Sequence, residues 1–447
     1  MSVAGVIKPL AALLLLAGSI SSKASPQGPG ASNLLPPPTG PSVIGRITYH
    51  WVDSSRAEFL QEDAPGRREL IVDVWYPAGP EPARPVATYL PDLGTLRAAI
   101  ADSLMLRHFA PAYAAMEAGR LTTHAVEASR AQCPPDGCPV LVFSHGGGVD
   151  RSFYTAQYED FASHGYLVAA VAHTFDTHVV VFPDGRVITA APARPDTMAL
   201  DRSIPAWRHQ LERERRSEAY VQRIIQVEAD DIRFVIDQLT RYAYDPALGA
   251  PFFRRANLNA IGALGHSAGG EAAARACQLD ARIRACLNQD GVMHNLPFAR
   301  DTAGRTMKQP FMYISREYKR PPLSDSQLSV MEMTRAQADS VFHAIATGQD
   351  ELLADMPAGA YRVTLTVPGM THMSFSDEPL IEASGDSVKT ANALLALRIV
   401  GTYSRAFFDH TLFGKPASAL GHPNPADSAF VRVERFRPKS ARGPVRQ

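Results

Sequence analysis

The chain has 447 residues, of which 45% are apolar and 20% are charged, and its formal net charge is zero. This is an ordinary globular composition, and the length allows one large domain or two of medium size. Because a zero balance provides no long-range attraction for a polyanion, a nucleic acid is not expected as a partner.

The first residues have the pattern of an export signal. Lys8 precedes an apolar run of about eleven residues, Leu10–Ile20, which is too short to cross a bilayer as a helix. Ser22 and Ala24 fit a cleavage site with small residues, so we expect a signal peptide over residues 1–24. This predicts a secreted or periplasmic protein. The alternative is a buried or membrane-anchoring helix.

A region rich in proline and glycine follows the predicted signal peptide. Residues 25–43 include SPQGPG and LLPPPTGP, a composition typical of a linker rather than of a packed core. Beyond it the pattern becomes globular, without an internal repeat. We expect one domain over residues 44–433 and a basic, solvated tail over residues 434–447.

Seven stretches have the pattern of β-strands. In the first, Val72, Val74 and Tyr76 alternate with Asp73 and Trp75. Later stretches include continuous apolar runs, which are typical of strands buried on both faces of a sheet. The seven predicted strands are residues 69–78, 138–148, 166–173, 258–267, 282–290, 310–315 and 361–369.

Helical patterns lie between these strands. They cover residues 154–165, the long charged stretch 202–239 and the alanine-rich stretch 269–277. Strands that alternate with helices predict an α/β fold with a mostly parallel central sheet and helices on both faces. Two large insertions, about residues 174–230 and 291–360, are candidates to cover a pocket. Within the second, residues 329–346 predict an amphipathic helix, which is more often part of a core than a contact with a lipid surface.

The four cysteines form two pairs that are local in sequence. Because the export signal indicates an oxidising compartment, we expect disulfides between Cys133 and Cys138 and between Cys277 and Cys286. Four cysteines permit three connectivities, and four free buried thiols are the alternative. The spacing in CPPDGC lacks the two-residue gap of common zinc motifs, so no metal site is expected.

A serine stands at a sharp junction between a predicted strand and a predicted helix. Residues 265–269, GHSAG, fit G-x-S-x-G, the nucleophile elbow of the α/β-hydrolase fold. The five-residue pattern is weak alone, but the apolar strand before it and the helix after it are the required context. We therefore expect Ser267 to be a nucleophile and the amide of Ala268 to be an oxyanion donor.

A second glycine loop follows a buried strand about 120 residues upstream. The sequence SHGGG, residues 144–148, predicts the other oxyanion donor, which we assign to the amide of Gly147. The alternative is a glycine turn without a ligand. His145 and His266 flank the two loops, and we interpret both as structural.

A serine nucleophile needs a base, and in this fold the acid and then the histidine follow the serine in the chain. Of the later histidines, only His372 comes directly after an apolar strand, in the loop PGMTHMSFSD; the others are His294, His343, His410 and His422. The acid is Asp290 or Glu317, which end consecutive predicted strands, and spacing alone does not choose between them.

Several segments together resemble the isoform II family of platelet-activating factor acetylhydrolases, which are serine lipases of the α/β-hydrolase fold. The similar segments are LIVDVWYPA, VFSHGGG, YEDFASHGYLVAAVAH, GHSAGG, LNQDG, QPFMYISREY and THMSFSD, between about residues 69 and 377. The resemblance implies Asp290 as the acid and His372 as the base, with the amides of Gly147 and Ala268 as oxyanion donors. The sequence departs from the animal enzymes at Gly147, where they carry a larger apolar residue, and in a longer gap between Asp290 and His372.

These patterns predict a serine hydrolase that cleaves carboxylic esters through an acyl-enzyme intermediate and needs no metal or nucleotide cofactor. The resemblance implies a short-acyl phospholipid or a related lipid ester as substrate. Two alternatives remain: a general carboxylesterase or a hydrolase of polyesters similar to cutinases, and a non-catalytic binding protein of the same fold. A transient contact with a lipid surface is a further possible interaction.

Overall fold

The computed structural model describes residues 33–437 except for residues 61–65, 80–83, 92, 101–102, 129, 191–205, 249–250, 292–306, 319–323, 326–327, 329–333 and 384. The described residues belong to one compact unit, Asn33–Gln447. The predicted signal peptide, the first part of the predicted linker and the last residues of the predicted tail lie outside the described residues.

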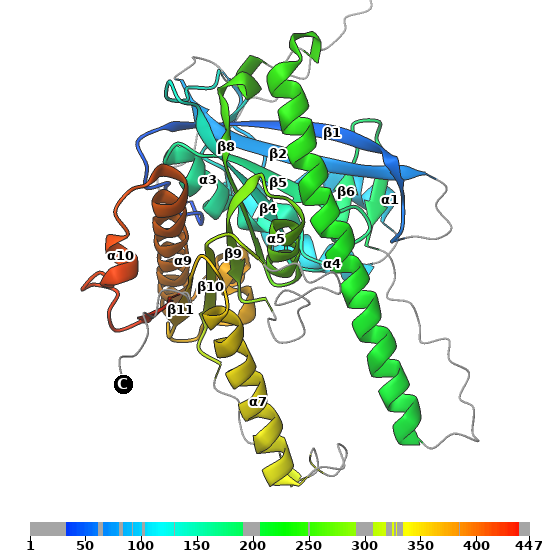
Figure 1. Ribbon diagram of the computed structural model, residues 1–447. Helices are drawn as coiled ribbons and strands as arrows, with labels where there is room; N and C mark the ends of the chain where they lie inside the picture. The colour runs from blue at the N-terminus through cyan, green and yellow to red at the C-terminus, as the bar shows by residue number, and fades with distance from the viewer. Residues whose placement is uncertain are drawn as a thin grey trace, which may run out of the picture. The chain divides into compact units, whose positions relative to one another are not determined.

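A large sheet runs through this unit in the order β12-β11-β10-β9-β8-β4-β5-β2-β1-β3 (Figure 1). The strands from β11 to β5 pair in parallel, whereas β12, β2 and β1 join by antiparallel pairing. The short strand β3 lies parallel to β1. The strands are β1 (Val43–Ala57), β2 (Arg67–Ala78), β3 (Ala125–Glu127), β4 (Cys138–Ser144), β5 (Leu167–Ala172), β8 (Ala256–His266), β9 (Ile283–Gln289), β10 (Phe311–Arg316), β11 (Ala360–Leu365) and β12 (Val431–Phe436).

Helices join the strands. They are α1 (Leu93–Ala99), α2 (Ser103–Glu117), α3 (Thr155–Ser163), α4 (Ala206–Tyr244), α5 (Ala268–Leu279), α7 (Arg335–Ala354), α8 (Glu378–Glu382), α9 (Ser387–Phe413) and α10 (Ser418–Gly421), with short 3₁₀ turns that include η1 (Arg151–Tyr154) and η4 (His372–Phe375). A hairpin of β6 (Val179–Val181) and β7 (Val187–Thr189) lies in the first predicted insertion. None of the described helices combines the length and the apolar character that a membrane span requires.

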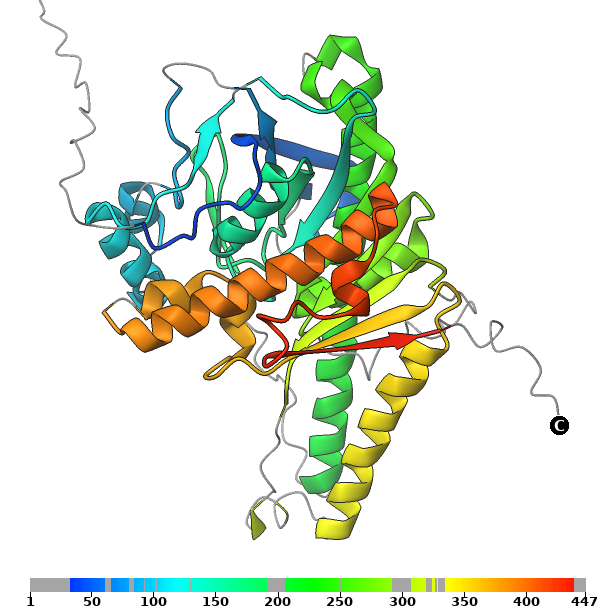
Figure 2. The ribbon, with the colours of Figure 1, turned by 90° about the vertical axis from the view of Figure 1, so that its left-hand side faces the viewer.

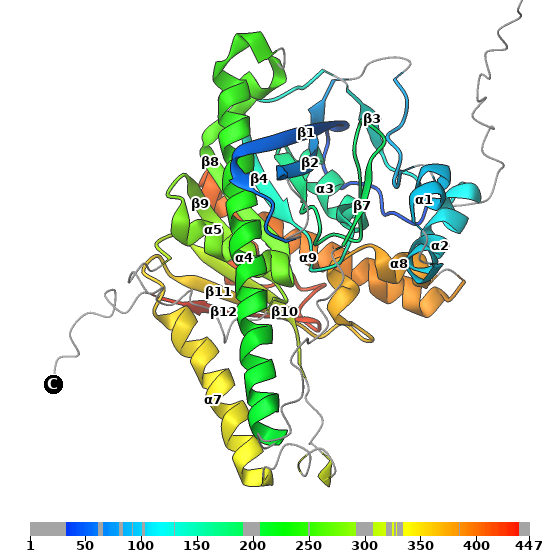
Figure 3. The ribbon, with the colours of Figure 1, turned by 90° about the vertical axis from the view of Figure 1, so that its right-hand side faces the viewer.

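The alternation of side chains along the strands decides which helices cover each face of the sheet. Leu141 and Phe143 of β4 belong to the same core as apolar residues of α3 and α9, whereas Val140 and Val142 belong to a second core with α4 and α5. Figures 2 and 3 show α9 and α4 on opposite faces. The predicted α/β architecture, a mostly parallel sheet with helices on both faces, is therefore confirmed.

All seven predicted strands are present, and their parallel pairing places several strand ends at one edge of the sheet. Ser267 follows β8, Asp290 follows β9, and the loop that holds His372 follows β11. In a parallel sheet the carboxyl ends of neighbouring strands meet at the same edge, where ligands of open α/β sheets bind. The topology thus brings together segments that are far apart in the sequence.

Both predicted boundaries of the domain differ from the observed elements. Residues 33–42, which we call the N-terminal arm, pack on the domain: Leu35 is buried, and Thr39 donates from its backbone N–H to Asp160 Oδ1 at 3.0 Å. At the other end, the expected tail begins inside β12, which pairs with β11 along six residues. A proline-rich composition did not prevent packing of the arm, because a single buried leucine and a few side-chain contacts anchor it.

The predicted amphipathic helix corresponds to α7, which begins at Arg335 and ends at Ala354. Leu352 and Leu353 near its end belong to the core beside α4 and α5, whereas His343 is exposed. Figure 3 shows that α2 lies near α8, and the two helices are in contact. Of these helices, α8 lies on the segment that follows η4.

Candidate active site

Ser267 lies in a strained turn between β8 and α5. Its φ of 53° and ψ of −124° are outside the regions that non-glycine residues favour, and such strain costs on the order of 1–3 kcal/mol. The flanking glycines permit the turn: a Cβ on Gly265 would lie 2.4 Å from the backbone of Gly269, and one on Gly269 would lie 2.2 Å from His145 O. The Ser267 N–H donates to Gln289 O at 2.8 Å, which ties the turn to the end of β9.

Asp290 and His372 are brought together by the ends of β9 and β11. His372 Nδ1 lies 2.8 Å from Asp290 Oδ2, a hydrogen bond in which the imidazole donates to the carboxylate. Asp290 also has a positive φ, 55°, and its N–H donates to Ile314 O at 2.8 Å. The ring of His372 lies 4.5 Å from that of His266, the residue before Ser267. The His372 side chain is 42% exposed, so an incoming molecule can reach it.

The other acid candidate, Glu317, lies one residue beyond the end of β10. The contact that the structure gives His372 is to Asp290, and the geometry therefore favours Asp290 as its partner. The end of β10 supplies Arg316 instead: its N–H donates to Asp290 Oδ1 at 3.3 Å, and its Nε lies 3.3 Å from Oδ2. Sequence reasoning missed this arginine, because no motif marks it.

The remaining histidine candidates do not join this group. His343 and His422 are exposed on α7 and after α10, and His410 Nδ1 bonds to Lys415 O at 2.9 Å. His294 lies outside the described residues.

The two predicted oxyanion donors lie next to each other. A Cβ built on Gly147 would be 3.6 Å from the Cβ of Ala268. The neighbouring amides are engaged: the Gly146 N–H donates to Tyr154 Oη at 3.0 Å, and the Gly148 N–H donates to Asp176 O at 3.1 Å. Gly147 is an exposed residue, and among the described residues no acceptor is found for its N–H. Ala268 is the first residue of α5, where amides have no intrahelical acceptor.

A buried histidine supports the glycine loop, as expected from its place in the sequence. His145 Nδ1 lies 2.8 Å from Gly146 O, and the His173 N–H donates to His145 Nε2 at 3.1 Å. Because a carbonyl only accepts, the proton must be on Nδ1. Burial and the neighbouring His173 lower the pKa of His145 to about 4, so the ring is neutral at neutral pH. His145 therefore fixes the direction of the Gly146 carbonyl.

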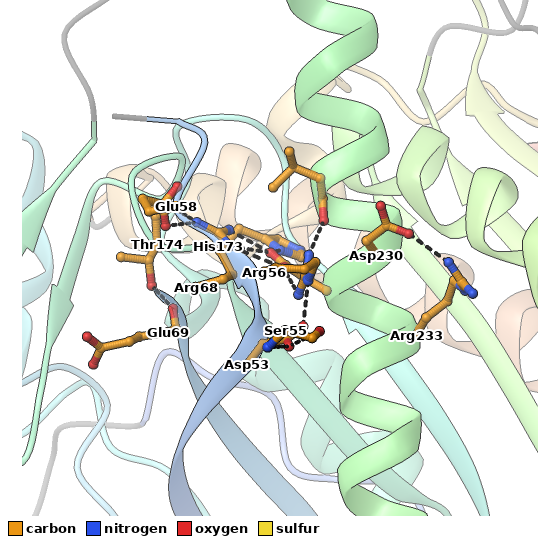
Figure 4. A network of polar contacts seen from close by, with 12 residues as sticks. Asp53, Ser55, Arg56, Glu58, Arg68, Glu69, His173, Thr174, Asp230 and Arg233 are labelled. Carbon is orange, nitrogen blue, oxygen red and sulfur yellow. Dashed lines mark hydrogen bonds and ion pairs between the residues drawn. The ribbon is translucent and has the colours of Figure 1, made fainter. Parts of the chain in front are cut away.

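A network of charged residues lies behind this loop (Figure 4). His173 Nδ1 bonds to Asp231 Oδ2 at 2.9 Å, and the Arg68 and Arg56 guanidinium groups lie 2.6 and 2.8 Å from the same carboxylate. Although burial alone would raise it, the pKa of Asp231 is held below its usual value by Arg68 and His173. Each buried charge in the centre of the network thus has an opposite partner, as it needs.

The same network contains a second chain of serine, histidine and aspartate. His173 Nε2 lies 2.8 Å from Ser144 Oγ, on the side of the ring opposite Asp231. All three residues are fully buried, so no substrate reaches Ser144. We interpret this chain as structural, because it joins the ends of β4 and β5 to α4 beneath the glycine loop. Sequence reasoning missed it, since residues on separate elements gave no local signal.

The loop that holds His372 is anchored by the residues that follow it. Phe375 is buried and stacks on the His266 ring at 5.5 Å. Asp377 is also buried, and its Oδ2 accepts from Tyr89 Oη at 3.0 Å and from the Ala156 N–H at 3.3 Å. Burial raises the pKa of Asp377. These residues hold the loop in place.

Both predicted disulfides are present: Cys133 pairs with Cys138, and Cys277 pairs with Cys286. The second bridge joins α5, which follows Ser267, to β9, which precedes Asp290. In the described part of the chain, His, Cys, Asp and Glu side chains form no group of three or more that could hold a metal ion.

Comparisons with known proteins give one consistent result. The family model described as "Platelet-activating factor acetylhydrolase, isoform II" matches residues 31–182. A relative from Arthroderma benhamiae, named "Probable 1-alkyl-2-acetylglycerophosphocholine esterase", is 26% identical over 88% of this chain and 92% of its own length. The "Platelet-activating factor acetylhydrolase" of Gallus gallus is 24% identical over 41% of this chain and 45% of its own.

A solved structure is similar over nearly the whole chain. It is a ferulic acid esterase from Streptomyces cinnamoneus, with 25% sequence identity and a TM-score of 0.64. The match covers 91% of this chain and 100% of that structure. The fold is therefore that of the α/β-hydrolases, as the elbow sequence predicts.

Proposed function

We propose that this carboxylic ester hydrolase, which resembles the isoform II family of platelet-activating factor acetylhydrolases, uses Ser267, His372 and Asp290 as its catalytic triad. The observation that carries the proposal is the 2.8 Å bond from His372 to Asp290 beside the strained turn of Ser267. It is supported by the adjacent positions of Gly147 and Ala268.

In the proposed reaction, His372 Nε2 takes the proton of the Ser267 hydroxyl as the oxygen attacks the ester carbonyl. Asp290 keeps the imidazole in the tautomer with a proton on Nδ1 and stabilises the imidazolium. The amides of Gly147 and Ala268 donate to the oxygen that becomes negative, and the loss of one such donor costs about 3 kcal/mol. His372 then protonates the leaving alcohol, and water releases the acyl group by the same steps.

We propose a short-acyl ester of a phospholipid or a related lipid as the substrate. The relative from Arthroderma benhamiae supports this choice, since its name specifies an acetyl ester and its alignment covers most of both chains. A second candidate is an ester of an aromatic acid, supported by the structural similarity to a ferulic acid esterase. A broad carboxylesterase or polyester hydrolase would cleave simple aryl esters or polyester films without preferring either.

The test is hydrolysis of a panel that includes an acetylated ether phospholipid, methyl ferulate, p-nitrophenyl esters of increasing acyl length and a polyester film. We expect the acetyl phospholipid to have the highest kcat/KM. Ser267→Ala should lower kcat by about 10⁴-fold or more, and Asp290→Asn by a factor between about 10² and 10⁴.

Glu317→Gln is the matched control for Asp290→Asn, because both exchange a carboxylate for an amide at the end of neighbouring strands. We expect the control to keep wild-type kcat. If Ser267→Ala keeps full activity, Ser267 is not the nucleophile and the proposed mechanism is wrong. If a fluorophosphonate fails to label Ser267 and no ester of the panel is cleaved, a non-catalytic binding protein of the same fold gains support.

We propose that the protein is exported and that residues 1–24 are removed. The two disulfides suit an oxidising compartment. Mass spectrometry of the exported protein should find an N-terminus at Ser25. A transient contact with lipid through the segment around α7 is also part of the proposal, and co-sedimentation with phosphatidylcholine vesicles tests it.

A further inference from the structure

A buried tyrosine lies between the two loops of the proposed oxyanion site. Tyr154, the last residue of η1, is fully buried. Its Oη accepts the Gly146 N–H at 3.0 Å and lies 2.8 Å from His266 Nδ1. One hydroxyl therefore contacts both the glycine loop after β4 and the residue that precedes Ser267.

The direction of these two hydrogen bonds follows from the groups involved. A tyrosine hydroxyl has one proton, and the Gly146 N–H can only donate, so His266 Nδ1 is the acceptor that the structure offers for that proton. The ring of His266 is then neutral, with its own proton on Nε2. This agrees with its surroundings, because burial and the neighbouring His372 lower the pKa of His266 to about 3.

Gly146 is enclosed by this arrangement. A Cβ built on it would lie 3.2 Å from Tyr154 Oη, 3.2 Å from His266 Nδ1 and 3.5 Å from Ser267 Cβ. Its carbonyl oxygen accepts from His145 Nδ1 at 2.8 Å and from the Val149 N–H at 3.0 Å. Both peptide groups that flank the Gly146 Cα are thus held. The first, which contains the Gly146 N–H, is held by Tyr154, and the second, which contains the Gly146 carbonyl, is held by His145 and Val149.

The orientation of the Gly147 amide depends on the second of these peptide groups. Because a peptide is planar and trans, the Gly147 N–H points opposite to the Gly146 carbonyl. A rotation about the bonds of the Gly146 Cα would turn this N–H, and the bond from the Gly146 N–H to Tyr154 restrains that rotation. The tyrosine also fixes His266, which is covalently joined to Ser267.

We propose that Tyr154 is a positioning residue of the esterase: its hydroxyl holds the oxyanion loop and the serine turn in one fixed arrangement. The inference rests on the proposed function of Ser267 and of the Gly147 amide. Tyr154 does not touch the ester itself, since it is buried. It acts through Gly146 and His266, and its hydroxyl matters more than its ring.

The same helix region contains a matched control. Tyr158 is also fully buried, and both tyrosine rings pack on Phe143, at 5.1 Å for Tyr154 and 5.0 Å for Tyr158. The Tyr158 hydroxyl, however, donates to Arg151 O at 3.0 Å and contacts neither loop of the site. Removing either hydroxyl leaves a buried acceptor or donor without its partner, so both changes should lower the melting temperature.

The experiment compares Tyr154→Phe with Tyr158→Phe on the acetyl ester that the wild type cleaves best. We expect Tyr154→Phe to lower kcat by about 10- to 100-fold with KM within about twofold, because the loss concerns a donor used in the transition state. The affinity for a trifluoromethyl ketone, which forms an oxyanion adduct, should fall in proportion to kcat/KM. Tyr158→Phe should keep kcat within about twofold.

Equal losses of kcat in both variants, or a rise in KM alone for Tyr154→Phe, would overturn the proposal. If Tyr154→Phe does not fold, His266→Phe serves instead, because it removes the acceptor of the Tyr154 hydroxyl. An unchanged kcat in His266→Phe contradicts the proposal, and a lower kcat supports it. The ¹⁵N chemical shifts of the His266 ring give a reading without substrate. We expect these shifts to show Nδ1 without a proton in the wild type and to show a changed Nδ1 shift in Tyr154→Phe. A protonated Nδ1 in the wild type would contradict the hydrogen bond from Tyr154 to His266, even if Ser267 is the nucleophile.

Discussion

At the scale of single residues, two of the four described non-glycine residues with a positive φ lie where chemistry is proposed, and the other two are Ala128 and Phe175. Ser267 and Asp290 both have a positive φ, and each directly follows a parallel strand of the sheet. Strain of this kind persists only where the surroundings determine the conformation. For Ser267 those surroundings are the close approach of Gly265 and Gly269 to the glycine loop, and for Asp290 they are bonds to the end of β10.

Gly146 and Gly147 of the proposed oxyanion loop should differ in their tolerance of a methyl group. A Cβ on Gly147 meets only ordinary contacts, at 3.6 Å to Ala268 and 4.0 Å to Asp176, whereas a Cβ on Gly146 meets Tyr154 and His266 at 3.2 Å. We therefore expect Gly147→Ala to keep kcat within about threefold and Gly146→Ala to lower it by about tenfold or more. Steady-state kinetics on an acetyl ester measures both, and the opposite order of effects contradicts the geometry.

Residues of the candidate site could be predicted from the sequence where a short motif beside a predicted strand marks them. Ser267, Gly147 and His372 stand in short motifs next to apolar strands, and the structure brings these segments together. The choice of Asp290 over Glu317 needed either a resemblance or a distance, because both residues end neighbouring strands. Tyr154 gave no signal at all, since a tyrosine at the start of a helix is an ordinary core residue.

At the scale of elements, the disulfide between Cys277 and Cys286 joins α5, the helix after the proposed nucleophile, to β9, the strand before the proposed acid. The bridge between Cys133 and Cys138 lies at the start of β4, at the opposite end of that strand from the glycine loop. The two bridges close loops of similar size, with sequence separations of 9 and 5 residues. We therefore expect the two bridges to contribute similar amounts to the free energy of unfolding, although only the bridge between Cys277 and Cys286 lies next to the candidate site.

We expect Cys277→Ser with Cys286→Ser, and separately Cys133→Ser with Cys138→Ser, to lower the free energy of unfolding by about 2–3 kcal/mol each. Only the variant without the bridge between Cys277 and Cys286 should lose the structure of the candidate site before the rest of the fold unfolds. In a urea titration, its activity should disappear before its tryptophan fluorescence changes, whereas the second pair should lose both signals together. Coincident transitions in both variants would show that the bridge does not support the site.

The elements that the sequence did not predict are at the edges of the sheet and on the helical layer. The strand β12, with sequence VRVERF, carries two arginines and a glutamate because an edge strand needs little apolar surface, and this polar pattern is typical of a tail. The central strands were predicted because they are buried on both faces and read as apolar runs. Parallel pairing then followed from the alternation of strands with helices.

At the scale of the whole molecule, two buried neutral histidines make the fold sensitive to acid. The pKa of His145 is lowered to about 4 by burial and His173, and that of His266 to about 3 by burial and His372. An unfolded histidine has a pKa of about 6.5. Below that pH the unfolded chain binds more protons at these residues than the folded one, so the free energy of unfolding falls as the pH decreases.

At about pH 4.5 the loss from these two residues together should be on the order of 5 kcal/mol relative to neutral pH. Urea unfolding of the wild type and of histidine variants between about pH 8 and pH 4.5 measures it, and the comparison is needed because Asp377, whose pKa burial raises, contributes a slope of the opposite sign. His266→Phe should reduce the slope of the free energy of unfolding against pH by about one proton. A slope that is the same in His266→Phe and in the wild type would contradict the assignment of a neutral buried ring to His266.

The N-terminal arm has a practical consequence for anyone who handles this protein. The Leu34 N–H donates to Arg120 O at 2.7 Å, the Leu35 side chain is covered, and Thr39 Oγ1 donates to Asp160 Oδ1 at 2.6 Å. A recombinant version trimmed to start at β1 would lose all three anchors and uncover part of α3. An affinity tag, or a linkage to a solid support for biocatalysis, is therefore best attached upstream of Asn33.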